Sequence, residues 1–257
     1  MSKILTTNSA DGNLISYGIS GTGQTTLFFI HGWTCNHTFW KHQLESFSDR
    51  YKIVWLDLAG HGLSESDREN YSIKSFAEDV ITVVNAVGDN NIVLIGHSLG
   101  GAIAIEAAKV LDEKLLDIVA VDTFYTPFPY PDSEQGIKEL MQPFKDNYSD
   151  TLNGLVRSLF SDEVDPKLIE SILMQMSSVD KQISISTLTG VLYWHIDNMP
   201  VSLNKFYGKL HHINGTPTPP GSPDNITLIA DAGHFVAQVA PEKFDKILLK
   251  IITRHNK

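Results

Sequence analysis

Short apolar runs alternate along this chain with stretches in which hydrophobic residues recur every three or four positions. The apolar runs are rich in β-branched residues and are bounded by turn residues, which predicts strands buried on both faces of a sheet. We expect strands at 13–20, 26–30, 52–56, 92–95, 116–121, 210–213 and 226–229. The recurring stripes predict helices at 73–84, 102–110 and 244–252. This alternation is typical of α/β proteins with a mostly parallel sheet covered by helices on both faces.

One segment, from Phe124 to about Asn198, departs from the alternation and is predicted to be mostly helical. Its four apolar stripes fall at 137–144, 152–160, 168–176 and 185–192. Prolines mark its two ends, at positions 127, 129, 131 and 200. A single enlarged crossover helix is the alternative, but four stripes are too many for one crossover. We therefore expect a core formed by 1–123 and 199–257, with 124–198 inserted as a helical cap, or lid, over one edge of the sheet.

Composition places the chain among ordinary globular proteins with one sizeable core. Its 257 residues carry a formal net charge of −10, which disfavours nucleic acid and membrane surfaces as partners. The N-terminus has no long apolar run, and no stretch approaches the roughly 18 apolar residues of a spanning helix. The single cysteine, Cys35, excludes an internal disulfide and fits a reducing compartment. We therefore expect a cytoplasmic protein.

The run Gly96-His-Ser-Leu-Gly-Gly101 follows an expected strand and precedes an expected helix. This is the context of a G-x-S-x-G nucleophile turn, in which glycines allow a bend too sharp for larger side chains. The Ser98 hydroxyl would stand at a helix N-terminus, where backbone N–H groups favour a developing negative charge. The alternative is a Ser-Gly turn without chemistry, and the strand–turn–helix context argues against it. Ser98 is therefore the candidate nucleophile.

A serine needs a base to become an effective nucleophile, and two histidines are candidates. His234 follows the strand expected at 226–229 and precedes the final helix, so its ring could reach the carboxyl edge of the sheet. His97 adjoins Ser98, but neighbouring residues on a tight turn point apart. We expect His234 to be the base. The alternative is that it is an ordinary surface-loop histidine.

Four motifs in a fixed order give the chain a likeness to a known family. They are His31-Gly-Trp33, the run from Asp57 to Ser64, the run from Gly96 to Gly101, and Ala232-Gly-His234. Together they resemble the α/β-hydrolase superfamily, and the likeness covers nearly the whole chain except the expected lid. Each motif alone is weak, whereas four in this order and spacing are specific.

The resemblance carries its own implications. It implies an eight-stranded, mostly parallel sheet with the helical cap inserted after strand six. It implies an oxyanion hole made by the backbone N–H groups of Trp33 and Leu99. Asp57 and His61 match a loop that is structural in this superfamily, so we expect them to be scaffold residues.

The acidic partner of His234 departs from the commonest family pattern. Superfamily members usually carry it after strand seven, but the stretch 213–217 has no Asp or Glu. Asp122 stands at the carboxyl edge of the preceding strand, and some family members take the acid from there. Asp231 lies close to His234 in one short loop and is better placed to set a turn; Asp224 is the other rival. We expect Asp122 to be the acid, and its alternative role is to anchor the start of the lid.

The remaining motifs and reactive residues along the chain are better explained by ordinary structural roles. The segment 18–25 resembles a P-loop, but Gln24 replaces the phosphate-binding lysine and a strand follows where a helix is needed. His211 and His212 lie on one strand, so their rings point to opposite faces and cannot share a metal ion. Cys35 is expected to be a packed thiol and a candidate oxidation site. We expect no cofactor and no metal.

These observations favour a serine hydrolase, resembling carboxylesterases, that cleaves a small to medium carboxylic ester with an apolar acyl group. Haloalkane dehalogenases and epoxide hydrolases share the architecture but are expected to use Asp as nucleophile, so Ser98 argues against both. Carbon–carbon-bond hydrolases, lactonases, thioesterases and perhydrolases keep the serine and remain alternatives. A slow-turnover ligand receptor of the same fold is the alternative of another class, and an inactive scaffold is the least supported.

Overall fold

The computed structural model describes residues 3–65, 67–69 and 71–255. Within these residues the strands form a single eight-stranded sheet in the order β1-β2-β4-β3-β5-β6-β7-β8. The strands are β1 (Lys3–Asn8), β2 (Leu14–Ser20), β3 (Thr26–Ile30), β4 (Lys52–Leu56), β5 (Ile92–His97), β6 (Leu115–Val121), β7 (Leu210–Asn214) and β8 (Ile226–Leu228).

The sheet is parallel from β4 through β8 and antiparallel where β2 pairs with β1 and β4. The prediction of a mostly parallel eight-stranded sheet flanked by helices is thereby confirmed. All seven strands expected from the apolar runs are present. The eighth, β1, is an edge strand whose side chains are exposed or half-buried, so it lacks the apolar signature of the others.

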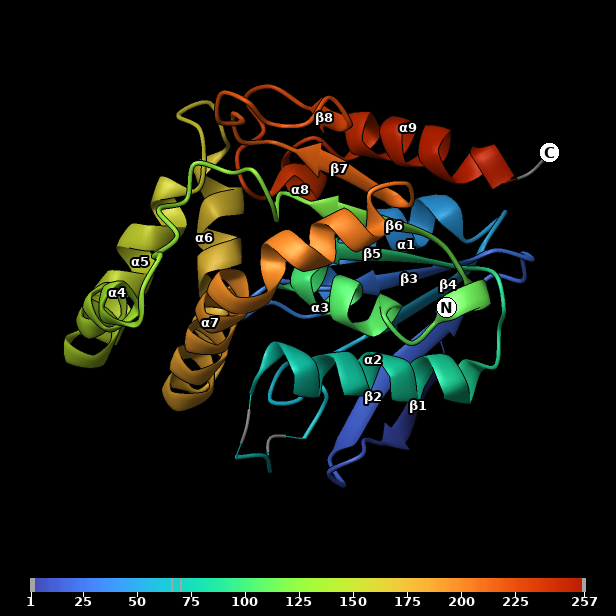
Figure 1. Cartoon of the computed structure of the whole chain (residues 1–257), viewed down its shortest axis with the longest axis horizontal. Helices are drawn as coiled ribbons and strands as arrows, with labels where there is room; N and C mark the ends of the chain where they lie inside the picture. Colours follow the sequence, from blue (N-terminus) through green and yellow to red (C-terminus); the bar gives the residue numbers. More distant parts are fainter. Residues whose placement is uncertain (1–2, 66, 70, 256–257) are drawn as a thin grey trace.

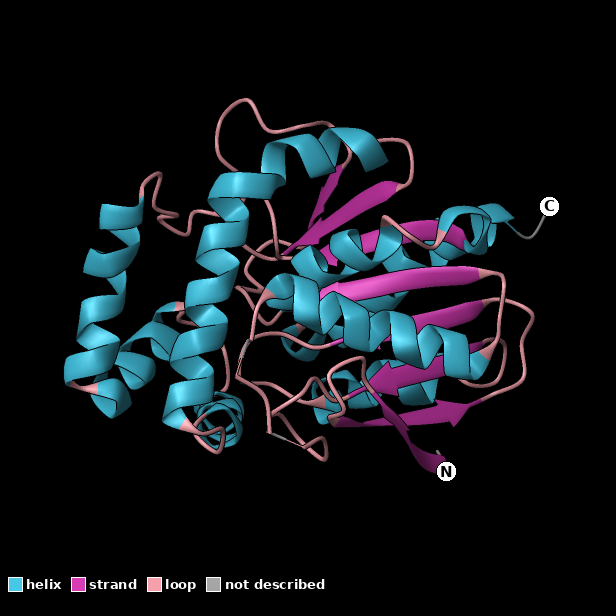
Figure 2. Ribbon diagram, turned by 60° about the horizontal axis from the view of Figure 1, so that its bottom comes forward, coloured by secondary structure: helices cyan, strands magenta, loops and turns pink. Residues whose placement is uncertain are grey.

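Helices cover both faces of the sheet (Figures 1 and 2). One apolar core lies beneath α2 (Ile73–Val87) and α3 (Leu99–Ala108), and a second lies beneath α1 (Lys41–Phe47) and α9 (Pro241–Ile252). The short elements are α8 (Val236–Val239) and the 3₁₀ turns η1 (His37–Trp40), η2 (Asp112–Lys114) and η3 (Thr253–His255). The three helices expected outside the insertion are found, with ends that differ by a few residues.

The chain between β6 and β7 contains α4 (Glu134–Asp146), α5 (Tyr148–Ser158), α6 (Pro166–Met176) and α7 (Lys181–Phe206). We call these four helices the helical insertion; α4, α5 and α6 lie beyond the carboxyl ends of the strands, at the left of Figure 1. Each of the four apolar stripes forms one helix. The expectation that Pro200 marks the end of this segment is wrong, because Pro200 lies inside α7. The following turn stays helical although proline donates no hydrogen bond, since Leu203 and Phe206 are buried.

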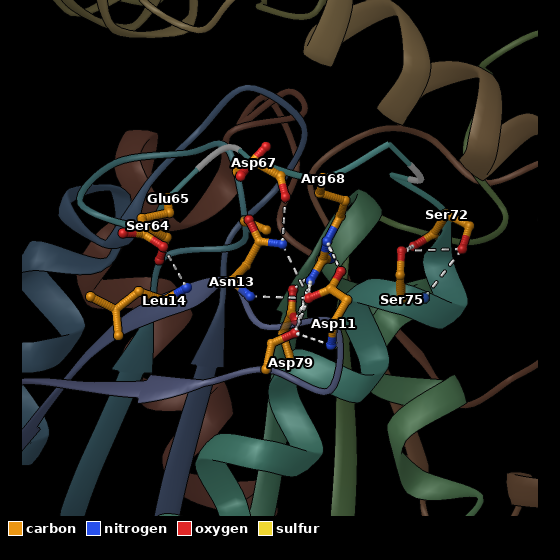
Figure 3. Close-up of polar contacts among 12 residues, drawn as sticks. Asp11, Asn13, Leu14, Ser64, Glu65, Asp67, Arg68, Ser72, Ser75 and Asp79 are labelled. Atoms are coloured by element: carbon orange, nitrogen blue, oxygen red, sulfur yellow. Dashed lines mark hydrogen bonds and ion pairs between the residues drawn. The ribbon is translucent and has the colours of Figure 1, made fainter.

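An ion-pair cluster centred on the buried Arg68 side chain connects the segment after β4 to the rest of the core (Figure 3). The Arg68 guanidinium, 2% exposed, contacts the fully buried Asp79 carboxylate of α2 at 2.6 Å. It also pairs with Asp11, in the turn between β1 and β2, at 2.7 Å. Asn13 donates to the Asp11 carboxylate and to the Asp67 carbonyl oxygen. The cluster therefore joins the edge hairpin, α2 and the loop that precedes it.

Replacing Asp79 with alanine is expected to lower the free energy of unfolding by about 3 kcal/mol, because it leaves the buried Arg68 charge short of its main partner. Urea unfolding of the variant and the wild type measures the change. Glu78→Ala, on the exposed side of the same helix, is the matched control and should change stability by less than about 0.5 kcal/mol. Equal losses in the two variants would contradict a special role for the ion pair.

Candidate active site

Ser98 lies at the turn between β5 and α3, with a backbone φ of 52° and ψ of −119°. A positive φ is costly for a residue with a side chain, so the surrounding structure must hold it in place. The Ser98 N–H donates to the Val121 carbonyl oxygen at 2.9 Å, which extends the pairing of β5 with β6 by one residue. The sharp turn predicted from G-x-S-x-G is therefore present.

Two glycines of the motif explain why the turn tolerates no larger residue. A Cβ on Gly96 would lie 2.1 Å from the carbonyl oxygen of Gly100. A Cβ on Gly100 would lie 2.5 Å from the carbonyl oxygen of Ile30, at the end of β3. The start of α3 therefore packs directly against backbone on both sides, and that packing fixes the position of Ser98.

Asp122 and His234, far apart in sequence, form a hydrogen bond in which Nδ1 of the imidazole meets Oδ2 of the carboxylate at 2.7 Å. Asp122 follows β6 directly, has a positive φ of 44°, and its side chain is fully buried. Its other oxygen, Oδ1, accepts hydrogen bonds from the N–H groups of Gly215 and Thr216 and from the Thr216 hydroxyl. Burial opposes ionisation, but these bonds together with that from His234 hold the pKa of Asp122 below its usual range.

The donors after β7 were missed by the sequence reasoning. The turn at Gly215 and Thr216 carries no carboxylate, and from the sequence we inferred only that the acid is absent there. It instead supplies three hydrogen-bond donors to the Asp122 carboxylate. β6 and β7 end side by side, and the N–H of Asp122 extends their pairing by donating to the Ile213 carbonyl oxygen. The adjacency of these two strand ends is the signal from which the donors could have been predicted.

The rival carboxylates lie elsewhere. Asp224 is exposed in the loop before β8, outside the cavity described below. Asp231 lines that cavity with an exposed side chain and a φ of 65°, and its carbonyl oxygen accepts a hydrogen bond from the Ser161 hydroxyl. Only Asp122, among the three candidates, is bonded to the His234 ring within the described residues.

The backbone of His234 is held on both sides. Its N–H donates to the Leu159 carbonyl oxygen, at the C-terminal end of α5, at 2.8 Å. Its own carbonyl oxygen accepts a hydrogen bond from Nε2 of His97 at 2.9 Å. Burial, followed by the nearby imidazole of His234, lowers the pKa of His97 to about 3, so that ring is neutral at ordinary pH. His97 therefore supports the loop that carries His234.

Gly233→Ala is expected to lower activity at least tenfold, because the new Cβ would lie 2.7 Å from the Leu159 carbonyl oxygen and would push the His234 loop away from the helical insertion. Steady-state kinetics on an activated ester measures the loss. Gly221→Ala is the matched control: its φ of +84° is as unfavourable for alanine as the +63° of Gly233, but no atom lies within 4 Å of the new Cβ. Similar activity losses in both variants would contradict the role of this contact.

A cavity of about 830 Å³ lies between the carboxyl edge of the sheet and the helical insertion. All five residues singled out from the sequence line it: Ser98, Asp122, His234, Trp33 and Leu99. The insertion contributes apolar side chains, among them Leu140, Phe144, Leu155, Leu188 and Leu192. The loop carrying Trp33 is tied to the insertion, because the indole Nε1 donates to the Ser184 carbonyl oxygen at 2.8 Å.

The residues expected to be structural lie outside this cavity. The buried Asp57 carboxylate accepts hydrogen bonds from the N–H groups of His37 and Leu63, while Nδ1 of His61 donates to the Ala59 carbonyl oxygen. These bonds shape the loop after β4.

The pair His211 and His212 shows the expected opposite orientation. The His211 ring contacts Asp117, and the His212 ring packs against Phe124 and Tyr125. In the part of the chain that the structure describes, no group of three or more His, Cys, Asp or Glu side chains could hold a metal ion.

Two further observations concern the thiol and the helices. Cys35 is buried, and burial raises the pKa of its thiol, so it lacks the exposed thiolate that oxidation requires. No helix formed by the described residues is long and apolar enough to cross a bilayer.

Known proteins share this architecture. The AB hydrolase superfamily protein YisY of Bacillus subtilis is 32% identical over 152 residues, covering 55% of this chain and 56% of that protein. The Karrikin insensitive 2 receptor CA of Petunia hybrida is 25% identical over 179 residues, covering 66% of each. The chain thus spans 56% to 66% of the length of these curated relatives.

Among solved structures, a thermophilic esterase from Thermogutta terrifontis superposes with a TM-score of 0.80 at 21% identity, over 99% of this chain and 98% of that one. This likeness concerns the fold. The sequence profile described as alpha/beta hydrolase fold matches residues 25–168, which is more than half of the 257 residues. The chain belongs to the α/β-hydrolase family.

Proposed function

We propose that this protein is a serine hydrolase that cleaves small to medium carboxylic esters, with Ser98 as nucleophile, His234 as base and Asp122 as acid. The observation that carries the proposal is the 2.7 Å bond between the Asp122 carboxylate and the His234 imidazole, within the same cavity that Ser98 lines. An acid bonded to the Nδ1 side of a histidine leaves Nε2 free to accept a proton from the nucleophile.

In the proposed reaction, Nε2 of His234 takes the hydroxyl proton of Ser98 as the serine oxygen attacks the acyl carbon. Asp122 holds the imidazole in the tautomer with Nδ1–H and stabilises the cation that forms. His234 then returns the proton to the leaving alcohol, and the acyl group stays on Ser98. A water molecule, activated in turn by His234, releases the acid and restores the enzyme.

The backbone N–H groups of Leu99 and Trp33 are proposed to bind the oxyanion. Leu99 is the first residue of α3, and N–H groups in the first turn of a helix have no intrahelical acceptor. Trp33 follows β3 in a loop that is fixed to the insertion by its indole. Each donor contributes on the order of 3 kcal/mol to transition-state stabilisation.

The helical insertion is proposed to act as a cap over the cavity, and the remainder of the chain as the catalytic core. Its apolar lining side chains support an acyl substrate that is itself largely apolar. We place the C-terminal limit of this proposed cap nearer Phe206 than position 198; the uninterrupted course of α7 to Phe206 supports that choice.

A ligand receptor of slow turnover is the second candidate function. The observation that favours it is the match to a protein named as a receptor over 66% of both chains. Carbon–carbon-bond hydrolases, lactonases, thioesterases and perhydrolases would use the same three residues, so the activity panel below includes their substrates.

Steady-state turnover of p-nitrophenyl acetate and butyrate, a lactone and a thioester tests the proposal. A hydrolase should release many product equivalents per protein molecule at a constant rate, with the p-nitrophenyl esters or a related acyl compound preferred. A receptor should release about one equivalent and then become nearly inactive. Absence of product, together with absence of fluorophosphonate labelling, would overturn the proposal.

A further inference from the structure

Most hydroxyl groups that line the cavity are already used within the protein. The Thr151 hydroxyl bonds to the carbonyl oxygens of Pro143 and Asn147 at 3.0 and 2.7 Å. Ser158 and Ser161 donate to backbone carbonyl oxygens at 2.7 and 2.8 Å. A hydroxyl has a single hydrogen to donate, so these side chains offer no free donor to a ligand.

Tyr130 and His195 differ from these residues. Tyr130 lies in the link between β6 and α4, His195 lies on α7, and both line the cavity. Their rings are stacked with centroids 3.7 Å apart and planes within 1° of parallel, which holds both side chains in one orientation. Across the described residues, the Tyr130 hydroxyl and the two ring nitrogens of His195 have no hydrogen-bond partner in the protein. Each of these atoms is accessible to solvent.

Both groups are uncharged at neutral pH. Burial, followed by the nearby Asp122 carboxylate, raises the pKa of the Tyr130 phenol. Burial lowers the pKa of His195 to about 4. The pair therefore presents a phenol that can donate a hydrogen bond and a neutral imidazole that can both donate and accept.

The charges around the cavity disfavour substrates that carry a free carboxylate. Its lining, within the described part of the chain, contains the carboxylates of Asp122 and Asp231 but no Lys or Arg. A carboxylate on the substrate would lose its hydration and meet no cation in return. An uncharged oxygen function has a smaller cost of desolvation and would find its partners at Tyr130 and His195.

We infer that the Tyr130–His195 pair is a second binding subsite, which recognises an uncharged oxygen function such as a ketone or hydroxyl on the substrate that Ser98 cleaves. The inference rests on the proposed function, since it names the class of substrate of that same site. The preferred substrate is thus an ester with an apolar chain that carries one neutral polar group remote from the scissile carbonyl.

Three six-carbon p-nitrophenyl esters test this inference: the hexanoate, the 5-oxohexanoate and the adipate half-ester. Their distal groups differ but lie too far from the scissile carbonyl to change its reactivity much. The rate at which hydroxide alone hydrolyses each ester corrects for any remaining difference in reactivity. The wild type is expected to show kcat/KM about fivefold higher for the 5-oxohexanoate than for the hexanoate, and lowest for the anionic adipate, because one satisfied hydrogen bond that contributes about 1 kcal/mol corresponds to a factor of about five.

Tyr130→Phe and His195→Phe remove the polar atoms and keep two stacked rings. Each is expected to reduce several-fold the ratio of kcat/KM for the 5-oxohexanoate to kcat/KM for the hexanoate, because the hexanoate presents no distal oxygen to the pair. Tyr193→Phe is the matched control, because the Tyr193 hydroxyl bonds to Glu134 on the surface and does not line the cavity. Its preference should equal that of the wild type.

A wild type without preference for the 5-oxohexanoate would overturn the subsite, as would two phenylalanine variants with unchanged preference. Neither result depends on how well a variant folds, since the first uses the wild type and the second requires active variants. Failure of the proposed function has a different signature: no ester of the series would be turned over, and Ser98 would not react with a fluorophosphonate.

Discussion

Ser98→Ala is expected to lower ester turnover by about 10⁴-fold or more and to abolish labelling by a fluorophosphonate probe. The reason is chemical, since the proposed acyl-enzyme cannot form without the hydroxyl, and only binding and the oxyanion donors would remain. The expected loss equals about 5.5 kcal/mol or more of transition-state stabilisation. Steady-state rates on p-nitrophenyl butyrate and in-gel labelling measure both effects.

Ser158→Ala is the matched control for this experiment. Ser158 lines the same cavity, but its hydroxyl donates to the Leu155 carbonyl oxygen and has no proposed chemical role. It should keep both labelling and turnover close to the wild-type values. Labelling that persists in Ser98→Ala would identify another residue as the nucleophile and would refute the proposed mechanism.

Asp122→Asn is expected to reduce kcat by about 10³- to 10⁴-fold with the fold intact. The bonds around Asp122 explain why the loss should be large. Oδ1 already accepts from Gly215 and Thr216, so the amide oxygen of asparagine would take that place. The amide nitrogen would then face Nδ1 of His234 as a donor. The imidazole would be forced to carry its proton on Nε2, where it could not accept one from Ser98.

A thermal unfolding scan checks that the fold of Asp122→Asn is intact, and the pH dependence of kcat is measured beside it. Because the asparagine keeps the hydrogen bonds after β7, the melting temperature should fall by only a few degrees. Asp231→Asn is the control and should keep near-normal activity, since its side chain is exposed and not bonded to the imidazole. A near-normal rate for Asp122→Asn would show that Asp122 is not the acid, and a large loss in Asp231→Asn would then point to Asp231.

Local patterns in the sequence were sufficient for most of the fold. Strands buried on both faces, such as β5, carry continuous β-branched runs, and each helix of the insertion carries one apolar stripe. The turn at Ser98 is only partly local: the requirement for glycine at position 96 follows from the Gly100 carbonyl oxygen within the motif, whereas that at position 100 follows from the Ile30 carbonyl oxygen of β3. Features set by neighbouring residues in sequence were therefore predictable.

Several features set by distant contacts were not. Nothing in β1 marks it as a strand except its pairing with β2, and the helix continues past Pro200 because of buried residues beyond it. The donors of Thr216 to Asp122, and the bond from His234 to the Leu159 carbonyl oxygen, join segments more than 70 residues apart. Such contacts depend on how β-strand ends meet and on where the insertion folds back, neither of which leaves a periodic signal.

The hydrogen bond between His234 and Leu159 joins two main-chain atoms, the N–H of one and the carbonyl oxygen of the other. The side chain at position 159 takes no part in this bond, so the bond constrains the path of the backbone there and not the identity of the residue. Conversely, a helical insertion taken from a relative would have to reproduce that path, whatever its sequence. The helical insertion and the loop bearing His234 would therefore have to change together, as one geometrical unit.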